Sequence, residues 1–402
     1  MTSLSRRQLF LNHVAQTSTY PLMLEVSRAE GIYIWDTNGK KYYDLNSGIS
    51  VSSLGHRHPS VVQAIKDQVD LYMHTMVYGE HVQGPQTDYA ELLTAQLDPS
   101  LNSIYYLSSG SEVIEVAMKL AKKITGRYEI IAAANAYHGS TQGAESLRSD
   151  HEYSEAFLPL LPQIKHIDFN NHDDLSKITD KTAAVIMEPV QAEAGVFPPT
   201  GDYLQAVRKR CTETGTMMVL DEIQTGFGRT GHLFAHQKYN VIPDMLCIGK
   251  AMGGGMPIGG LVADQALLGG FTKNPDLGHI TTFGGHPVVC AAAKATLETL
   301  LESKIVDRVE KKSQYIRERL QHPIVNEVRH AGMMMAVELT SRKYIKHVVG
   351  HAFEHGALVD YFLFNNRSFR LAPPLIYTMS ELAEAMDVLV GALDYAKGKY
   401  EK

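Results

Sequence analysis

Residues 183–187, 216–220 and 245–249 read Ala-Ala-Val-Ile-Met, Thr-Met-Met-Val-Leu and Met-Leu-Cys-Ile-Gly. Short apolar runs of this size, bounded by polar and glycine residues, are typical of buried strands in a parallel sheet. The three runs lead directly into Glu188, Asp221 and Lys250. Ligands of open α/β sheets bind just beyond the carboxyl ends of the strands, so these three side chains are expected to belong to one site.

On both sides of these runs in the sequence, strand-like and helical stretches alternate, from about residue 57 to 291. The segments that show this most clearly are Ile104–Leu107, 112–124, Glu129–Ala133 and 203–213. Such alternation predicts a mainly parallel sheet covered by helices on both faces. We therefore expect an α/β fold in which residues 57–291 form the large domain.

The two ends of the chain predict a smaller α+β domain, made of residues 1–56 and 292–402. Residues 32–45 indicate a β-hairpin around Asn38-Gly39. In the C-terminal part, the pattern predicts a long amphipathic helix over about 294–320, strands at 334–339 and 368–371, and a last helix over 381–396.

Composition excludes several classes of protein. The 402 residues are 44% hydrophobic and 20% charged, with a formal net charge of −6. A chain with that charge spread along its length has no electrostatic footprint for nucleic acid or an anionic membrane. No apolar run approaches the roughly 18 residues of a membrane helix. Three widely separated cysteines suggest neither a disulfide framework nor a metal pair, which favours a reducing, cytoplasmic location.

Lys250 and Asp221 together indicate a specific cofactor chemistry. Alone, a lysine before a glycine-rich loop is expected at the surface, and an aspartate at a strand end is expected to cap a helix. As a pair at neighbouring strand ends they match the needs of pyridoxal phosphate. The lysine amine forms a Schiff base with the cofactor aldehyde, and the aspartate holds the pyridine nitrogen protonated. The sequence around Lys250 fits neither the Walker nor the dinucleotide-binding glycine pattern.

Two further motifs fit a phosphate and a planar ring. Ser109-Gly110-Ser111-Glu112 follows a predicted strand and has the spacing of a capping box, and a glycine-containing helix N-terminus suits a phosphate. Tyr137-His138-Gly139 follows the next strand, where an aromatic ring can stack on a cofactor. Taken singly, a capped helix without ligand and a core tyrosine explain these motifs equally well or better.

His56 and His58 form a His-x-His pair without a third ligand at suitable spacing, so a role in a turn or cap is favoured over a metal site. We predict no metal. Arg370 can bind a substrate carboxylate in bidentate fashion, although an isolated arginine is usually solvated.

With these motifs the chain resembles the class-III aminotransferases, which use pyridoxal phosphate and have the aspartate-aminotransferase-like architecture known as fold type I. The resemblance runs from about residue 10 to 397 and is greatest to the acetylornithine, ornithine and 4-aminobutyrate transaminase branch. Beyond the motifs above it rests on Gly48–Val51, Leu54–His56, Glu188-Pro189, Asp221–Gly226, Thr282–Gly285 and Arg370 with Pro373-Pro374.

The resemblance implies a role for each site residue. Lys250 carries the cofactor and moves the proton between substrate and cofactor, and Asp221 holds the pyridine nitrogen. Arg370 takes the α-carboxylate of the acceptor, and Glu193 neutralises Arg370 when another substrate is bound. The remaining cofactor-binding residues implied are Ser109, Gly110, Ser111, Tyr137, His138, Glu188, Ile223 and Gln224.

The resemblance also implies a homodimer with shared sites, because Thr282 would contact the phosphate bound to the neighbouring subunit. Its small-molecule partners would be an amino donor and a 2-oxo acid acceptor in a ping-pong cycle. Two alternatives remain open at this point. One is another reaction of the same cofactor, an aminomutase or decarboxylase, and the other is a non-catalytic α/β ligand-binding protein.

One departure from the family pattern concerns the donor. Members of this branch usually have an arginine directly after His-Gly, where this chain has Ser140. That arginine helps to hold a donor carboxylate, so its absence predicts broader donor use, including ω-amines and β-amino acids. Tyr20, Tyr78 or an arginine from elsewhere in the chain could replace it. Ser108 and His286 are two further departures from the usual residues.

Overall fold

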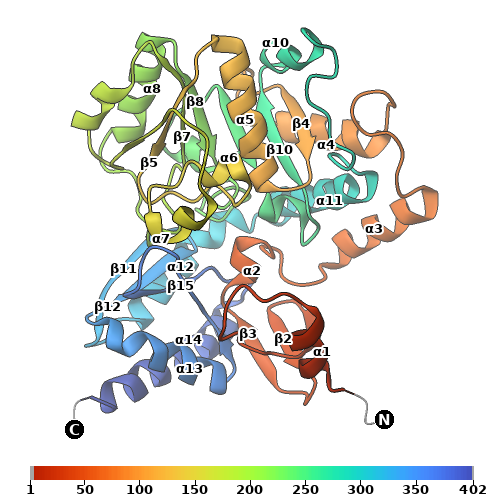
Figure 1. The fold of residues 1–402 in the computed structure, drawn as a ribbon. Helices are drawn as coiled ribbons and strands as arrows, with labels where there is room; N and C mark the ends of the chain where they lie inside the picture. Colours follow the sequence, from red (N-terminus) through yellow and green to blue (C-terminus); the bar gives the residue numbers. More distant parts are fainter. Residues whose placement is uncertain (1–3, 401–402) are drawn as a thin grey trace.

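A computed structural model describes residues 4–400. Its largest sheet, in the upper half of Figure 1, has seven strands. In spatial order they are β4 (Ser103–Leu107), β10 (Gly259–Ala263), β9 (Met245–Ile248), β8 (Met217–Asp221), β7 (Thr182–Met187), β5 (Glu129–Ala133) and β6 (Ile164–Ile167). β10 runs antiparallel to both of its neighbours, and the pairs from β9 to β6 are parallel. The predicted mainly parallel sheet is therefore confirmed.

The sheet is buried on both faces because its strands are apolar throughout. Ile131, Val185 and Leu220 point into one hydrophobic cluster, whereas Ile130, Ile186 and Val219 point into another. Helix α5 (Gly110–Thr125) packs in the second cluster, and α8 (Tyr203–Thr214) in the first. A side chain alternates faces at each step along a strand, so only a continuous apolar run fills both clusters.

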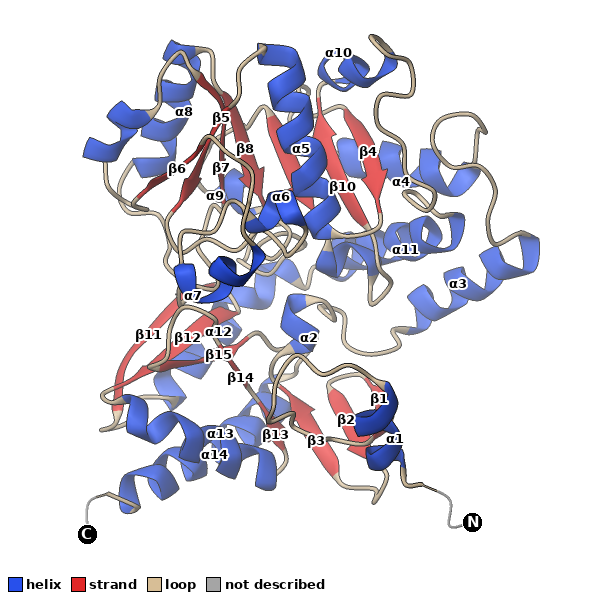
Figure 2. Ribbon diagram, viewed as in Figure 1, coloured by secondary structure: helices blue, strands red, loops and turns tan. Residues whose placement is uncertain are grey.

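Two four-stranded sheets form the lower half of the molecule, where both ends of the described chain lie (Figures 1 and 2). One contains β1 (Val26–Glu30), β2 (Tyr33–Asp36), β3 (Lys41–Asp44) and β13 (Ala357–Leu358). The other contains β11 (Val325–Ala331), β12 (Met334–Leu339), β15 (Ser368–Leu371) and β14 (Asp360–Tyr361). The predicted hairpin is present as the antiparallel pair β2 and β3.

The other helices connect and cover these sheets. The α-helices are α1 (Arg6–His13), α2 (Ser47–Ser50), α3 (Pro59–Leu71), α4 (Gly84–Thr94), α6 (Gln142–Glu145), α7 (His151–Ser154), α9 (Ala235–Lys238), α10 (Gln265–Leu268), α11 (Pro287–Ser303), α12 (Val309–Arg319), α13 (Ile345–Glu354) and α14 (Met379–Gly398). Short 3₁₀ turns are η1 (Glu155–Phe157), η2 (Asp173–Lys177), η3 (Lys250–Gly253), η4 (Gly269–Thr272), η5 (Val306–Arg308) and η6 (Arg342–Tyr344). Within residues 4–400 none of the helices combines the length and apolar character needed to cross a membrane.

The prediction of one long helix over 294–320 is wrong. The chain breaks after α11, where Lys304 adopts a left-handed conformation with φ 51°, and resumes as η5 and α12. The reason is packing: α11 lies against α3 and α4, whereas α12 packs with α14 in the lower half. Helix α11 continues across residue 291, where the predicted large domain ends and the predicted small domain resumes. That division into domains stays a prediction.

Arg229 ties the upper and lower halves together. Its guanidinium is fully buried and donates from Nη1 to the carbonyl oxygens of Met333 (3.1 Å) and Pro373 (2.6 Å), and from Nη2 to Ser53 Oγ (3.2 Å). Burial lowers the pKa of Arg229 to about 9. Three acceptors from three distant segments thus converge on one side chain.

Candidate active site

The strand-end residues singled out in the sequence surround one pocket beyond the carboxyl ends of β5, β7, β8 and β9. The pocket is lined by Gly110, Ser111, Tyr137, His138, Gly139, Glu188, Asp221, Ile223, Gln224, Thr225 and Lys250. Each parallel strand delivers its side chain to the same edge of the sheet, which explains why residues distant in sequence meet here. Nine of these residues were predicted for the site. Gly139 and Thr225 were not, although both belong to motifs quoted above.

Asp221 and His138 form a buried pair at this pocket. His138 Nδ1 lies 2.7 Å from Asp221 Oδ2, and Asp221 Oδ1 accepts the backbone N–H of Ile223 at 3.0 Å. Burial opposes a charge on His138, but the hydrogen bond and charge of Asp221 outweigh it and raise the histidine pKa. The carboxylate is thus oriented from two sides.

Lys250 lies at the end of β9 in a backbone conformation with φ 46°, which is uncommon for a residue other than glycine. Burial lowers the pKa of its amine, while Asp221 and Glu193 oppose this and Arg370 adds to it. A lowered amine pKa increases the fraction of neutral, nucleophilic lysine. Of these three charged groups, Asp221 lines the same pocket as Lys250.

Glu188 is buried, and only one of its two carboxylate oxygens has a hydrogen-bond partner among the described residues. Oε1 accepts the backbone N–H of Ala192 at 3.0 Å, and Oε2 has no hydrogen-bond partner within the described chain. Burial raises the pKa of Glu188 to about 7, with His138 lowering it and Asp221 raising it further. Both Oε2 and His138 Nε2, which is likewise unpartnered among residues 4–400, are polar atoms suited to a bound molecule.

The N-terminus of α5 forms a cradle at the pocket wall. Ser109 caps the helix, and its backbone N–H and that of Ser108 both donate to Glu112 Oε2, so the predicted capping box is present. Gly139 lies against this terminus with φ 131°, where a Cβ would come within 2.0 Å of Ser111 Oγ. Only glycine allows this approach, which leaves the first-turn N–H groups facing the pocket.

Arg370 and Glu193 form a second buried pair. Arg370 Nη2 lies 2.6 and 2.5 Å from the two carboxylate oxygens of Glu193, and the arginine is only 2% exposed. Its Nε and Nη1 have no hydrogen-bond partners in the part of the chain described. An arginine with two donors left over fits a carboxylate brought by a substrate.

Three predicted residues lie apart from this pocket in the single chain. Tyr20 is 91% exposed, Tyr78 lines a separate cavity with Gln86 and Thr281, and Thr282 is exposed. Ser140 is exposed too, but its backbone N–H donates to Ser111 Oγ at 3.2 Å and its hydroxyl lies 3.3 Å from the Tyr137 hydroxyl. The roles of all four stay predictions.

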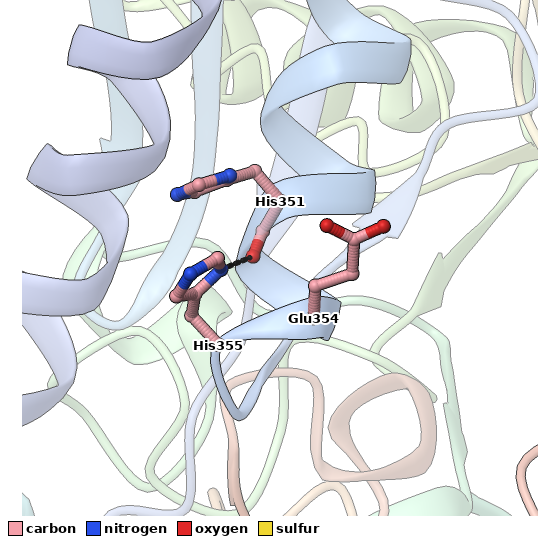
Figure 3. Close-up of side chains that lie close together, drawn as sticks. All are labelled: His351, Glu354 and His355. Carbon is pink, nitrogen blue, oxygen red and sulfur yellow. Dashed lines mark hydrogen bonds between the residues drawn. The ribbon is translucent and has the colours of Figure 1, made fainter.

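Among the described residues, one group has the composition of a metal site, and it lies on α13. His351, Glu354 and His355 are close together there (Figure 3). The two imidazoles stack, with ring centroids 3.8 Å apart and planes 24° from parallel. His355 Nδ1 lies 2.8 Å from the backbone carbonyl oxygen of His351, so this nitrogen already has a hydrogen-bond partner. His56 Nε2 lies 2.8 Å from Asp44 Oδ2, and His58 is at the N-cap of α3 without a side-chain capping hydrogen bond, so the turn-and-cap role stays a prediction.

The residues of the pocket fit pyridoxal phosphate. The amine of Lys250, the oriented carboxylate of Asp221, the cradle at α5 and the ring of Tyr137 supply what the aldehyde, ring nitrogen, phosphate and ring face of that molecule need. The unpartnered atoms at Glu188 and His138 also lie at this pocket.

Comparisons with known proteins agree with this chemistry. The family model for class-III aminotransferases matches residues 14–393. An acetylornithine aminotransferase of Methanopyrus kandleri is 38% identical over 386 residues, covering 95% of this chain and 96% of that protein. A [LysW]-aminoadipate semialdehyde/glutamate semialdehyde transaminase of Sulfurisphaera tokodaii is 38% identical over 325 residues, covering 79% and 82%.

The fold is similar to solved transaminases as well. The ornithine aminotransferase of Toxoplasma gondii, with pyridoxal phosphate partially occupying its active site, superposes with a TM-score of 0.90 at 29% identity and covers 98% of this chain and 94% of its own. These likenesses decide between the alternatives in favour of a transaminase over another cofactor reaction or a non-catalytic protein. With the family model spanning almost its entire length, this chain belongs to the class-III aminotransferases, enzymes of fold type I that use pyridoxal phosphate.

Proposed function

We propose that this enzyme moves an amino group from the terminal amine of an amino-acid-like donor to a 2-oxo acid, at the pocket around Lys250. The observation that carries the proposal is the buried Arg370–Glu193 pair, in which Arg370 keeps two nitrogens without a hydrogen-bond partner among the described residues. This guanidinium binds the α-carboxylate of the 2-oxo acid. Glu193 neutralises that guanidinium when the donor places a different group there.

Pyridoxal phosphate, when bound, supplies an aldehyde that accepts the amino group and a ring that withdraws electrons from the breaking C–H bond. The chain's own residues hold and serve it. Lys250 attaches the cofactor in the resting enzyme and then carries the proton at its Nζ. Asp221 would keep the ring nitrogen protonated, and His138 orients Asp221 through its hydrogen bond. The N–H groups at Gly110 and Ser111 would hold the phosphate, and Tyr137 and Ile223, which line the pocket, would border the ring.

The donor class is supported by the relatives, which are named for acetylornithine and for ornithine. Those donors carry their reacting amine far from an α-carboxylate. The three cysteines of this chain are buried free thiols, which supports our placement of the enzyme in the reducing cytoplasm.

A homodimer is part of the proposal. Met73, Met76, Leu277, Ile280 and Phe283 are large apolar side chains that are all more than 40% exposed. The two segments that carry them touch through His74 and Phe283, whose rings are 5.1 Å apart. Exposed apolar surface of this kind marks a protein interface, and it surrounds the exposed Thr282 that would reach the partner's phosphate.

Borohydride reduction followed by peptide mass spectrometry tests the site. We expect the mass of the reduced cofactor on the peptide that contains Lys250, and neither this adduct nor turnover in Lys250→Ala. The variant should keep its fold, because the rest of the pocket is unchanged. Arg370→Met serves as the matched control: it should keep the adduct but lose turnover with 2-oxoglutarate. An adduct on another lysine in the wild type would overturn the assignment of Lys250.

A further inference from the structure

Arg148 is a buried arginine with one unused edge, and it is absent from the site that the sequence predicted. Its side chain is 5% exposed. Nη1 donates to both oxygens of Glu145, at 3.1 and 3.3 Å, and Nε donates to Asp150 Oδ2 at 3.1 Å. Nη2 is buried and has no hydrogen-bond partner among residues 4–400. A buried guanidinium nitrogen without an acceptor is costly and calls for an explanation.

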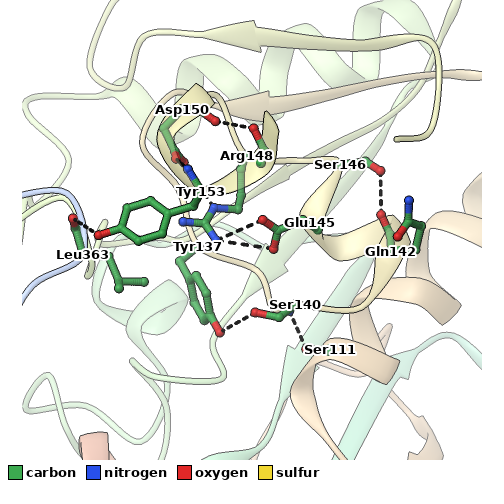
Figure 4. A network of polar contacts seen from close by, with 11 residues as sticks. Ser111, Tyr137, Ser140, Gln142, Glu145, Ser146, Arg148, Asp150, Tyr153 and Leu363 are labelled. Atoms are coloured by element: carbon green, nitrogen blue, oxygen red, sulfur yellow. Dashed lines mark hydrogen bonds and ion pairs between the residues drawn. The ribbon is translucent and has the colours of Figure 1, made fainter. Parts of the chain in front are cut away.

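Three aromatic rings surround the guanidinium of Arg148, and one of these rings also lines the pocket. Its central carbon lies 5.9 Å from the ring centroid of Tyr137, which lines the pocket, and 4.7 and 5.2 Å from those of Tyr153 and Phe364. Figure 4 shows the Arg148 head group between the rings of Tyr153 and Tyr137, with Glu145 on its other side and Ser140 below at the Tyr137 hydroxyl. The unused edge therefore belongs to the same corner of the molecule as Ser140.

Arg148 also shares its surroundings with Arg370. The guanidinium of Arg370 lies 4.7 Å from the ring of Phe362, and that of Arg148 lies against Phe364 of the same segment. The backbone N–H of Phe364 donates to the carbonyl oxygen of Glu193, the partner of Arg370. Each arginine is buried, each is paired with a glutamate, and each keeps at least one donor unused.

We propose that Arg148 binds the carboxylate of the amino donor, in place of the arginine that is missing at Ser140. The proposal deepens the proposed function and rests on it, since it names the donor as an ω-amino acid whose carboxylate lies several carbons from the reacting amine. Arg370 and Arg148 thus form two carboxylate subsites along the segment 362–364. The first serves the acceptor and the second serves the donor.

Charge balance at Arg148 sets the character of this subsite. Glu145 and Asp150 together outweigh the single positive charge of Arg148, so a carboxylate that binds the free Nη2 competes with them for this guanidinium, as one that binds Arg370 competes with Glu193. The subsite is therefore a gated one. A donor without a carboxylate leaves Arg148 paired with Glu145 and loses nothing, so simple amines remain substrates.

The test compares two donors of equal length, 4-aminobutyrate and n-butylamine, with N-acetylornithine as a third, in single-turnover reactions of the holoenzyme. The variant is the double substitution Arg148→Gln with Glu145→Gln, which removes both charges and keeps hydrogen-bonding groups. We expect at least about a tenfold loss of kcat/KM for the two carboxylate donors, the effect of losing one charge-assisted hydrogen bond. The value for n-butylamine should stay within about twofold.

Two further measurements separate substrate binding from a structural role. Glu145→Gln alone should lower KM for 4-aminobutyrate, because it frees Arg148. Calorimetric titration with pentanoate, an unreactive carboxylate, should show weaker binding to the double variant than to wild type. Arg127 lies at the opposite end of the sheet, where it donates to backbone carbonyls, so Arg127→Gln is the control for loss of an arginine outside the pocket and should alter no donor preference.

The outcomes distinguish this proposal from the proposed function. Equal losses for 4-aminobutyrate and n-butylamine, or unchanged pentanoate binding, would overturn the role of Arg148 while leaving the transaminase intact. A wild-type enzyme that transfers no amino group from any of the three donors would instead overturn the proposed donor class itself.

Discussion

His138 Nδ1 lies 2.7 Å from Asp221 Oδ2, and both side chains are almost fully buried at the floor of the pocket. Because Asp221 accepts this bond, the histidine carries its proton on Nδ1 and leaves Nε2 unpartnered within the described chain. The pair holds the Asp221 carboxylate in a fixed orientation. It also connects the end of β8 to the loop that follows β5.

The Asp221–His138 relationship predicts a graded loss of rate. Asp221→Asn keeps the shape but loses the charge facing the ring nitrogen, so we expect turnover to fall by about 10²–10³ at nearly unchanged cofactor content. His138→Phe removes the supporting hydrogen bond together with the unpartnered Nε2 and should cost about ten- to a hundredfold. Single-turnover rates and cofactor absorbance measure both. An Asp221→Asn enzyme within about twofold of wild type would contradict the role of Asp221.

Glu188 predicts a pH dependence of stability in the apoprotein. Its pKa is raised to about 7 in the fold, against roughly 4.3 when unfolded. Between these values the folded state binds more protons than the unfolded state, so the free energy of unfolding falls as pH rises through this window. Glu188→Gln keeps the oxygen that accepts the Ala192 N–H and removes the titration.

Urea denaturation of the two apoproteins at pH 5 and pH 8 measures this effect. The stability of Glu188→Gln relative to wild type should be greater at pH 8 than at pH 5. Asp174→Asn is a suitable control, because its carboxyl is at the surface and its pKa is shifted downward by Lys177, the opposite direction. An identical pH profile for wild type and Glu188→Gln would show that Glu188 is already ionised in the fold.

Much of the fold could be predicted because its signals are local. The runs that became β5, β7, β8 and β9 are apolar and short, and Ser109 with Glu112 defined the start of α5. The strand-end rule then brought Glu188, Asp221 and Lys250 together without any knowledge of the tertiary structure. These are features in which one stretch of chain determines its own conformation.

What the sequence could not supply depends on partners far apart in the chain. The break at Lys304 arises because α11 and α12 pack on different layers, and no local residue such as glycine or proline indicates it in the sequence.

Arg148 was missed for a related reason. Its unused nitrogen is visible only once Glu145, Asp150 and the rings of Tyr153 and Phe364 surround it. The i,i+3 spacing of Glu145 and Arg148 was the only available signal.

Glu193 predicts a change of substrate preference. In the structure it occupies Nη2 of Arg370 with both carboxylate oxygens. Glu193→Gln removes the competing charge, so α-carboxylates should bind Arg370 more readily, and kcat/KM for glutamate relative to 4-aminobutyrate should rise by about tenfold. Steady-state kinetics with both donors measures the ratio. A ratio that stays constant while both rates fall would assign Glu193 a purely structural role.

The proposed dimer predicts that cofactor retention depends on protein concentration. Thr282 is exposed beside Phe283, which is itself 57% exposed, and the phosphate it would contact belongs to the partner. Thr282→Val should increase cofactor loss without changing the oligomer, whereas Phe283→Asp should weaken the oligomer first. Sedimentation velocity and cofactor fluorescence over a dilution series check this. A fully active monomer at assay concentration would contradict the shared site.

The last prediction concerns Ser140 and Arg148 together. If Arg148 holds the donor carboxylate, adding an arginine at position 140 should have little effect in the wild type, because the subsite already has a guanidinium. In the double variant that lacks the charges of Arg148 and Glu145, Ser140→Arg should restore at least about half of the lost preference for 4-aminobutyrate over n-butylamine. The location of Ser140 allows this restoration. Its backbone N–H donates to Ser111 Oγ, and its hydroxyl lies next to the hydroxyl of Tyr137, whose ring is one of those around the Arg148 guanidinium. Ser140→Lys in the same background is the control, since a lysine lacks the planar fork and should restore less. A wild-type enzyme in which Ser140→Arg alone raises carboxylate-donor selectivity by tenfold or more would mean that Arg148 leaves that carboxylate unbound, and the broader donor use expected from Ser140 would then hold.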